Sequence, residues 1–136
     1  MIVDIAHICL GAANLAETEQ FYCQVLGLRK TFDFICAGKC IGFYLEVTRG
    51  RYIEVFQADS LEASDRHPIR HLCLQVDDMD ALRRNLVSGG AEVTGKTLGA
   101  DHSWQMWTTD PNGVRIEFHQ YTPESCQLTG EPCILD

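Results

Sequence analysis

Long hydrophobic runs are missing from this chain of 136 residues. A transmembrane helix needs about 18 or more consecutive apolar residues, and because no such run occurs we expect no membrane partner. The N-terminal stretch MIVDIAHICL also lacks the basic segment and the cleavage-site pattern of a secretory signal peptide. The sequence therefore predicts a cytoplasmic protein.

Positive charge is also scarce, with 11 basic residues against 19 acidic ones and a net charge of −8. Proteins that follow the phosphates of DNA or RNA need a basic surface, so we expect no nucleic-acid partner. Glycine-rich phosphate loops and the Gly-x-Ser-x-Gly nucleophile motif are absent as well. Any catalytic or binding site is therefore expected to be built from residues outside these two motifs.

The seven cysteines do not have the pattern of a disulfide framework. Their number is odd and they are spread through apolar stretches, whereas small secreted scaffolds pair an even number. Cys36 and Cys40 are separated by three residues, but no second pair stands at a spacing that suits a structural zinc site. We therefore expect reduced thiols.

Apolar residues make up 46% of the chain, which is enough for a buried core, and the length is typical of one domain. Hydrophobic periodicity predicts the same order of elements in each half: a strand, a helix and three further strands. In the first half the strands are expected at residues 3–11, 29–36, 41–48 and 51–57, and the helix at 15–26. In the second half they are expected at 69–76, 91–97, 103–108 and 114–120, and the helix at 79–88.

Capping and turn residues set the expected boundaries. Asn14 and Gly27 suit the N-cap and the C′ position of the first helix, and Asp77 or Asp78 caps the second. The polar residues 59–68 are interpreted as a linker. We therefore expect a single domain over residues 1–125, made of a first module at about 1–60 and a second module at about 67–121, with an irregular tail over 122–136.

The two halves contain similar short sequences. HICL at residues 7–10 matches HLCL at 71–74, and YIEVFQ at 52–57 matches RIEFHQ at 115–120. The separation between the matched segments agrees to within one residue. A fixed separation is the signature of internal duplication, so the sequence predicts two copies of a βαβββ module.

The duplication places His7, Glu54, His71 and Glu117 at equivalent positions. A lone strand histidine usually belongs to the core or the surface, and a lone strand glutamate usually faces solvent. A charge within an apolar strand is costly unless it is paired, solvated or bound to a metal, and four such residues at matching places favour the last reading. Two imidazoles and two carboxylates suit Zn²⁺, Ni²⁺, Mn²⁺, Fe²⁺ or Co²⁺ and leave coordination positions open for a substrate.

Other residues on the same strand faces have open roles. Cys9 and Cys73 each follow a candidate histidine by two residues, so they either line the site or, as the favoured reading, fill space as small apolar side chains. His119 shares a face with Glu117 and either supports that side chain or lies in solvent.

Four segments resemble the vicinal oxygen chelate superfamily, which includes glyoxalase I, extradiol dioxygenases, methylmalonyl-CoA epimerase, and fosfomycin- and bleomycin-resistance proteins. They are HICLGAANLAETEQFYCQVLGL, RYIEVFQ, RHLCLQVDDMDAL and TDPNGVRIEFHQ, and the resemblance covers roughly residues 3–121. It implies an α+β fold in which two tandem βαβββ modules form a curved mixed sheet.

The resemblance also implies a reaction. His7, Glu54, His71 and Glu117 match the four metal ligands of glyoxalase I, whereas the dioxygenases use two histidines and one glutamate, and the epimerases typically have glutamine in place of Glu54. This implies one divalent ion per site, with Zn²⁺ or Ni²⁺ favoured, and a lyase or isomerase that moves a proton through an enediolate on a small α-oxo or hydroxy carbonyl substrate. Glu117 is the favoured base and Glu54 the second candidate.

Some features leave alternatives open. Gly11 and Ala58 stand where bacterial glutathione-dependent glyoxalases commonly have arginine and asparagine, which leaves the use of glutathione open. An Fe²⁺ dioxygenase of the same superfamily and a non-catalytic small-molecule binding or resistance protein are the alternatives. The resemblance to dimeric glyoxalases favours a homodimer, in which the site forms within one chain or across two.

Overall fold

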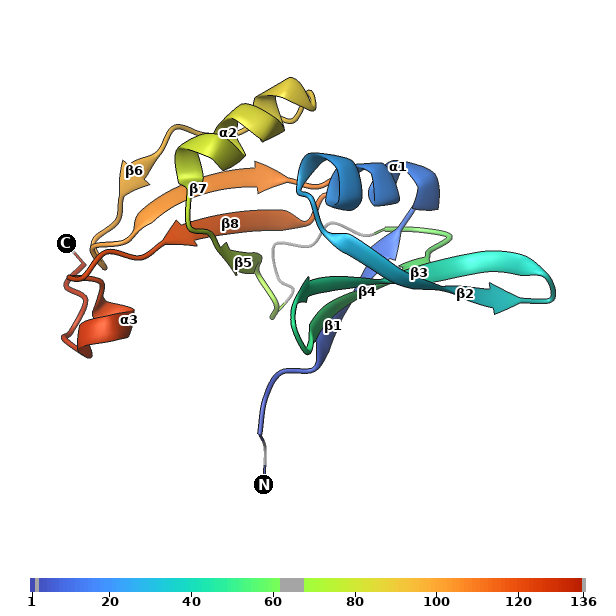
Figure 1. Ribbon diagram of the computed structural model, residues 1–136, viewed down its shortest axis with the longest axis horizontal. Helices are drawn as coiled ribbons and strands as arrows, with labels where there is room; N and C mark the ends of the chain where they lie inside the picture. The colour runs from blue at the N-terminus through green and yellow to red at the C-terminus, as the bar shows by residue number, and fades with distance from the viewer. Residues whose placement is uncertain (2, 62–67, 136) are drawn as a thin grey trace. The chain divides into compact units, whose positions relative to one another are not determined.

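The computed structural model of the protein describes residue 1, residues 3–61 and residues 68–135. The chain divides into two compact units, residues 1–63 and 64–136 (Figure 1). The first unit contains β1 (His7–Ala12), α1 (Leu15–Glu19), η1 (Gln20–Val25), β2 (Arg29–Cys36), β3 (Lys39–Thr48) and β4 (Arg51–Gln57). The second contains β5 (Leu72–Gln75), α2 (Met79–Ser88), β6 (Thr97–Leu98), β7 (Trp104–Thr109), β8 (Arg115–Gln120) and α3 (Cys126–Thr129).

The two units have the same sheet topology. The strand order is β1-β4-β3-β2 in the first and β5-β8-β7-β6 in the second. In each sheet the first strand runs parallel to the fourth, and the remaining neighbours are antiparallel. These two four-stranded mixed sheets with few helices confirm the predicted α+β fold of βαβββ modules.

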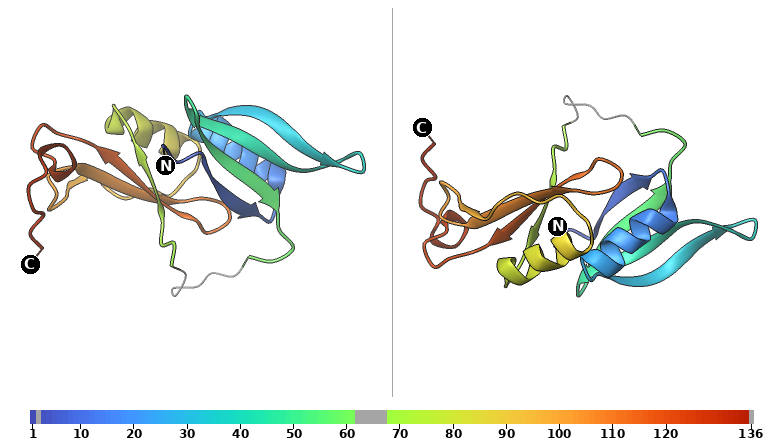
Figure 2. Two further views of the ribbon diagram at one scale, coloured as in Figure 1. Left: turned by 90° about the horizontal axis from the view of Figure 1, so that it is seen from below. Right: turned by 90° about the horizontal axis from the view of Figure 1, so that it is seen from above.

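In the first unit, α1 and η1 continue into each other and lie across one face of the sheet (Figures 1 and 2). The side chain of Asn14 accepts the backbone N–H of Glu17 at 3.1 Å, which confirms it as the N-cap. Gly27 has a φ of 77°, the left-handed conformation expected of a C′ glycine. The helix covers a buried apolar face that includes Phe43, Leu45, Ile53 and Val55.

The opposite face of the first sheet is aromatic. Strand residues alternate between faces, so the burial of Ile53 and Val55 turns Tyr52, Glu54 and Phe56 to the other side. Rings from β2 and β3 lie on the same face. Tyr44 on β3 is the cross-strand partner of Phe32 on β2 and of Glu54 on β4. This face carries the candidate site residues of the first unit.

In the second unit, α2 packs beside β8, and the side chain of Asp78 accepts the backbone N–H of Ala81 at 2.8 Å. Asp78, rather than Asp77, is therefore the cap. The core of this unit consists of fully buried apolar side chains, namely Met79, Leu86, Met106, Ile116 and Phe118. Among the residues that the structure describes, no helix has the length and hydrophobicity needed to cross a membrane.

Three predicted strands differ from the observed ones. The strand predicted at 69–76 is shorter, since β5 spans only Leu72–Gln75 and His71 directly precedes it. The strand predicted at 3–11 begins only at His7, because the segment before it lies in solvent, with Ile5 71% exposed. The strand predicted at 91–97 is wrong: the structure has one isolated bridge at Val93 and the two-residue β6. A side chain takes part of the ladder there: the N–H of Thr94 donates to the carbonyl of Trp107 at 2.9 Å, but the N–H of Trp107 donates to the hydroxyl of Thr94, also at 2.9 Å, instead of to a backbone carbonyl.

The remaining predictions concern the linker at 59–68 and the tail at 122–136. The expected linker at 59–68 lies partly outside the described residues, which omit 62–67. The tail expected to be irregular contains the single turn α3, which ends at Gly130 in the left-handed conformation with a φ of 75°. A single turn is too short to produce a periodic pattern in the sequence.

Candidate metal centre

In the first unit, His7 on β1 and Glu54 on β4 lie on neighbouring parallel strands. Nε2 of His7 is 3.6 Å from Oε2 of Glu54, and the side chains are 39% and 20% exposed. The other ring nitrogen, Nδ1, is 3.0 Å from the hydroxyl of Tyr44 on β3. A hydrogen bond at one nitrogen of a histidine orients the ring and leaves the other nitrogen for a ligand, so Nε2 is the atom available here.

In the second unit, His71 directly precedes β5 and Glu117 lies on the neighbouring β8. Nε2 of His71 is 3.1 Å from Oε2 of Glu117, and Glu117 is only 8% exposed. The ring of Trp107 stands edge-on to His71, with the ring centroids 4.9 Å apart. The second unit thus repeats the imidazole–carboxylate pair of the first in a more enclosed place.

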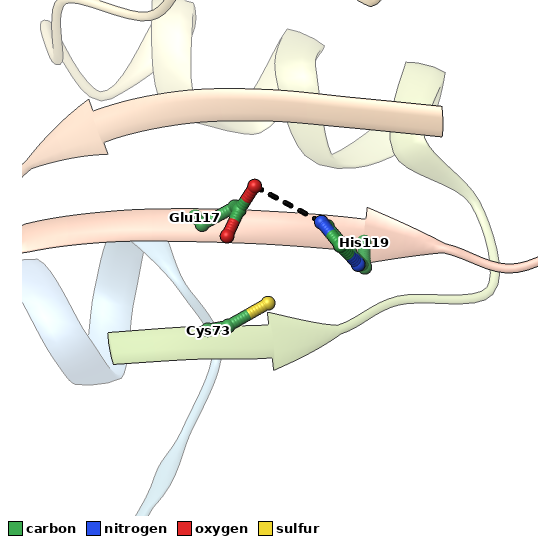
Figure 3. A group of neighbouring side chains, drawn as sticks. All are labelled: Cys73, Glu117 and His119. Carbon is green, nitrogen blue, oxygen red and sulfur yellow. Dashed lines mark hydrogen bonds and ion pairs between the residues drawn. The ribbon is translucent and has the colours of Figure 1, made fainter. Parts of the chain in front are cut away.

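His119 lies against Glu117 rather than in solvent. Its Nε2 is 3.0 Å from Oε1 of Glu117, and its side chain is 13% exposed. Figure 3 shows Glu117 and His119 next to each other on β8 and Cys73 on the neighbouring β5, with a dashed line for the contact between His119 and the carboxylate. Ligand atoms of these three residues lie within 4.8 Å of one another, so they form a group able to hold a metal ion.

The two cysteines beside the glutamates are protonated thiols at neutral pH. Desolvation and a hydrogen bond to Glu54 raise the pKa of Cys9. Desolvation, followed by the charge of Glu117, raises the pKa of Cys73 to about 12. Without a bound metal ion, each cysteine is therefore a neutral neighbour of its glutamate.

Each glutamate has equivalent neighbours on both adjacent strands. Glu54 lies across from Cys9 and Tyr44, and Glu117 lies across from Cys73 and Trp107. Sequence reasoning missed the two aromatic residues as parts of the site. A signal was present, because Tyr44 and Trp107 precede their glutamates by the same number of residues.

The two pairs fit a divalent cation. Zinc binds histidine nitrogen and carboxylate oxygen at about 2.0–2.2 Å in tetrahedral geometry, which puts two ligand atoms about 3.3–3.6 Å apart. The separations of 3.6 Å for His7 with Glu54 and 3.1 Å for His71 with Glu117 are close to this range. Each unit therefore brings one predicted histidine together with one predicted glutamate, and convergence of all four on one ion stays a prediction.

A sequence profile of the Glyoxalase/Bleomycin resistance protein/Dioxygenase superfamily matches residues 4–118. No curated protein matches the chain significantly.

Three solved structures share the fold at low sequence identity. A glyoxalase family protein from Enterococcus faecalis has a TM-score of 0.72 at 23% identity, over 85% of this chain and 96% of that one. Lactoylglutathione lyase from Agrobacterium tumefaciens has a TM-score of 0.64 at 22% identity, over 86% and 92%. TnmS3, an antibiotic binding protein from Streptomyces sp. CB03234, has a TM-score of 0.71 at 19% identity, over 89% and 98%. Identities this low show the fold and do not transfer an activity.

Proposed function

The chain belongs to the Glyoxalase/Bleomycin resistance protein/Dioxygenase superfamily, and from this membership we propose that it is a divalent-metal-dependent lyase or isomerase of the glyoxalase I type. The observation that carries the proposal is the repeated pair of imidazole and carboxylate, His7 with Glu54 and His71 with Glu117. The proposed substrate is a small compound with a carbonyl group next to a hydroxyl or second oxo group.

In the proposed reaction, His7, Glu54, His71 and Glu117 hold the metal ion. A divalent ion at such a site polarises a substrate carbonyl as a Lewis acid. One of the two glutamates takes the proton from the carbon next to the carbonyl and returns it to the neighbouring carbon. The electron pair of the broken C–H bond forms the C=C bond of an enediolate, and the carbonyl π pair moves onto the carbonyl oxygen. When the proton is delivered to the former carbonyl carbon, the hydroxyl proton passes from its own oxygen to the former carbonyl oxygen, and a new carbonyl forms at the carbon that lost its hydrogen. Tyr44 keeps the ring of His7 oriented through Nδ1.

Metal removal and replacement test this proposal. Protein purified without added metal is analysed for its elements, stripped with a chelator, and supplied in turn with Zn²⁺, Ni²⁺, Mn²⁺, Fe²⁺ and Co²⁺. Isomerisation of hemithioacetals formed with glutathione and with other thiols is then measured. We expect Zn²⁺ or Ni²⁺ to restore turnover, and the double variant His7→Ala/His71→Ala to bind neither ion. Oxygen uptake with catechols after Fe²⁺ addition would instead assign a dioxygenase.

The aromatic face of the first sheet supports a second candidate function, the binding of a planar molecule without catalysis. Phe32 stacks on Tyr44 at 4.8 Å, and Tyr44 stacks on Tyr52 at 5.0 Å between ring centroids. Phe34 stacks on Phe56 at 4.6 Å, and Phe32 remains 48% exposed. Exposed ring faces bind flat conjugated ligands well, and the similar fold of TnmS3 belongs to an antibiotic binding protein.

The same preparations separate the two candidates. A binding protein takes up a planar aromatic probe after chelation as tightly as before, and it contains no metal when purified. The proposed enzyme contains metal, and its turnover disappears with the ion. Purified protein that neither contains nor takes up any of the five ions contradicts the metal-dependent proposal.

A further inference from the structure

The two halves of the chain differ beside their glutamates. His119 follows Glu117 by two residues, whereas Phe56 stands at the equivalent place after Glu54. Side chains two residues apart on a strand share a face, so each glutamate has one of these rings as a neighbour. Imidazole forms hydrogen bonds with a carboxylate, and a phenyl ring does not.

Glu117 is held at both of its carboxylate oxygens. Its Oε2 lies 3.1 Å from Nε2 of His71, and its Oε1 lies 3.0 Å from Nε2 of His119. The residue is buried, with 8% exposed. Because leaving a buried polar group without its partner is costly, rotation of this carboxylate away from His119 is disfavoured, and this contact remains when His71 binds the metal ion.

His119 is in turn supported by the loop between β6 and β7. Its Nδ1, on the other side of the ring from Glu117, lies 3.9 Å from Oδ2 of Asp101. The carboxylate of Asp101 accepts hydrogen bonds from the backbone N–H of Ser103 at 3.1 Å and from Nε2 of Gln127 at 2.6 Å. These hydrogen bonds fix the carboxylate of Asp101, whose negative charge lies on the side of the imidazole ring away from Glu117.

Glu54 has fewer restraints. Its Oε2 is 3.6 Å from Nε2 of His7, and its side chain is 20% exposed, compared with 11% for that of Glu117. The ring at the equivalent position, Phe56, stacks on Phe34 and has no donor for the carboxylate. Glu54 is therefore freer to change its orientation than Glu117.

We propose that His119 is a positioning residue that fixes Glu117 as a permanent metal ligand, and that Glu54 is the carboxylate that exchanges the substrate proton. The assignment rests on the proposed function. It differs from the role that the family resemblance favours for Glu117, because a base has to reorient between the metal and the substrate carbon. The C–H proton passes to Glu54 while the bonding electron pair forms the C=C bond of the enediolate, and the same proton then returns to the adjacent carbon. The hydroxyl proton passes between the two substrate oxygens, so that a new carbonyl forms where the C–H bond was broken.

Metal affinity tests the role of His119 without any substrate. Zn²⁺ is titrated into the metal-free protein by calorimetry, with a competing chelator for the tight range. Loss of a side chain that orients a ligand typically weakens metal binding by roughly 10- to 100-fold, and we expect this for His119→Phe, which copies the first half. His119→Asn, with an amide too short to reach Glu117, should behave like His119→Phe. His119→Gln, with a longer amide that donates an N–H to Glu117, should restore most of the affinity.

The matched control is Phe56→Leu, which changes the equivalent residue of the first half and should leave Zn²⁺ affinity unchanged. Comparison of Glu117→Gln with Glu54→Gln completes the test. We expect Glu117→Gln to lose far more Zn²⁺ affinity. At saturating Zn²⁺, Glu54→Gln should lose more than about a hundredfold in turnover, and His119→Gln should keep most of it.

The outcomes distinguish this assignment from the proposed function. Wild-type protein that takes up no Zn²⁺ overturns both. Wild-type protein that takes up Zn²⁺ while folded His119→Phe and His119→Asn bind it equally well overturns the role of His119 alone. Normal turnover of Glu54→Gln, or a greater loss of Zn²⁺ affinity in Glu54→Gln than in Glu117→Gln, overturns the division of roles between the glutamates.

Discussion

At the scale of single residues, Tyr44 determines which nitrogen of His7 is available to a metal. The hydroxyl of Tyr44 is 3.0 Å from Nδ1, and Nε2 faces Glu54. A neutral imidazole carries one proton, so a hydrogen bond that keeps the proton on Nδ1 leaves the lone pair on Nε2. The equal spacing of Tyr44 and Trp107 before their glutamates marks Tyr44 in the sequence, but only the folded sheet shows that its hydroxyl reaches His7 across β4.

The substitution Tyr44→Phe tests this contact. The ring and its stacking remain, but the hydrogen bond to His7 is lost, so we expect Zn²⁺ affinity to fall by about tenfold, the lower end of such effects. Calorimetric titration of the metal-free protein measures the change. Tyr52→Phe is the control, since its ring stacks on Tyr44 at 5.0 Å and the contact between Tyr44 and His7 stays intact. Equal losses in the two variants would contradict the role of Tyr44.

At the scale of elements, each long helix is started by a capping side chain and covers the apolar face of its own sheet. The caps satisfy backbone N–H groups that have no partner within the helix. Asn14 does this for α1, and Asp78 does it for α2. Within the first helix the hydrogen bonds change from the α to the π pattern, as in the bond from the N–H of Leu26 to the carbonyl of Phe21 at 3.0 Å.

Removal of the second cap should destabilise the protein. Asp78→Ala leaves the backbone N–H of Ala81 without its side-chain acceptor, and we expect a loss of about 1 kcal/mol in the free energy of unfolding. Urea denaturation followed by circular dichroism measures it. Asp77→Ala removes an exposed carboxylate one residue earlier, which does not cap the helix, and should cost less than about 0.5 kcal/mol. A reversed order would assign the cap to Asp77.

At the scale of the whole molecule, each unit holds half of the predicted ligand set. Two ligands bind a divalent ion weakly, whereas known sites have three or four protein ligands, so the proposed centre combines the pair of one unit with the pair of another. The duplicated fold provides both pairs in the same sheet position, on the first and fourth strands. In the proposed homodimer, the two pairs come either from one chain or from two.

Mixed dimers distinguish these arrangements. One chain carries His7→Ala and Glu54→Ala, the other carries His71→Ala and Glu117→Ala, and the two are co-expressed with different tags and purified together. Because the resemblance is to dimeric glyoxalases, we expect the mixed dimer to bind one Zn²⁺ at the intact pairs, although neither variant binds it alone. Elemental analysis gives the ratio of metal to dimer. A metal-free mixed dimer, with one ion per chain in the wild type, would assign the site to a single chain.

The duplication of the chain, its element order and its candidate ligands could be read from the sequence. Alternation along β4 and β8 put Glu54 and Glu117 opposite apolar core residues, and repeated segments identified their partners His7 and His71. Strand alternation and repeated segments are local or periodic patterns, so they can be recognised without knowledge of the folded chain.

The tertiary structure decided which neighbours the candidate ligands have. The contact of His119 with Asp101, and the support of Asp101 by Gln127, join residues from β8, a loop and the tail. The wrong prediction of a strand at 91–97 also comes from a contact between distant segments. There the hydroxyl of Thr94 accepts the backbone N–H of Trp107. Sequence alone determined the candidate ligands, since histidine and glutamate each recur at a fixed spacing. Only the folded structure decided how firmly each candidate ligand is held. The restraints come from contacts between segments that are far apart in the sequence and have no regular spacing.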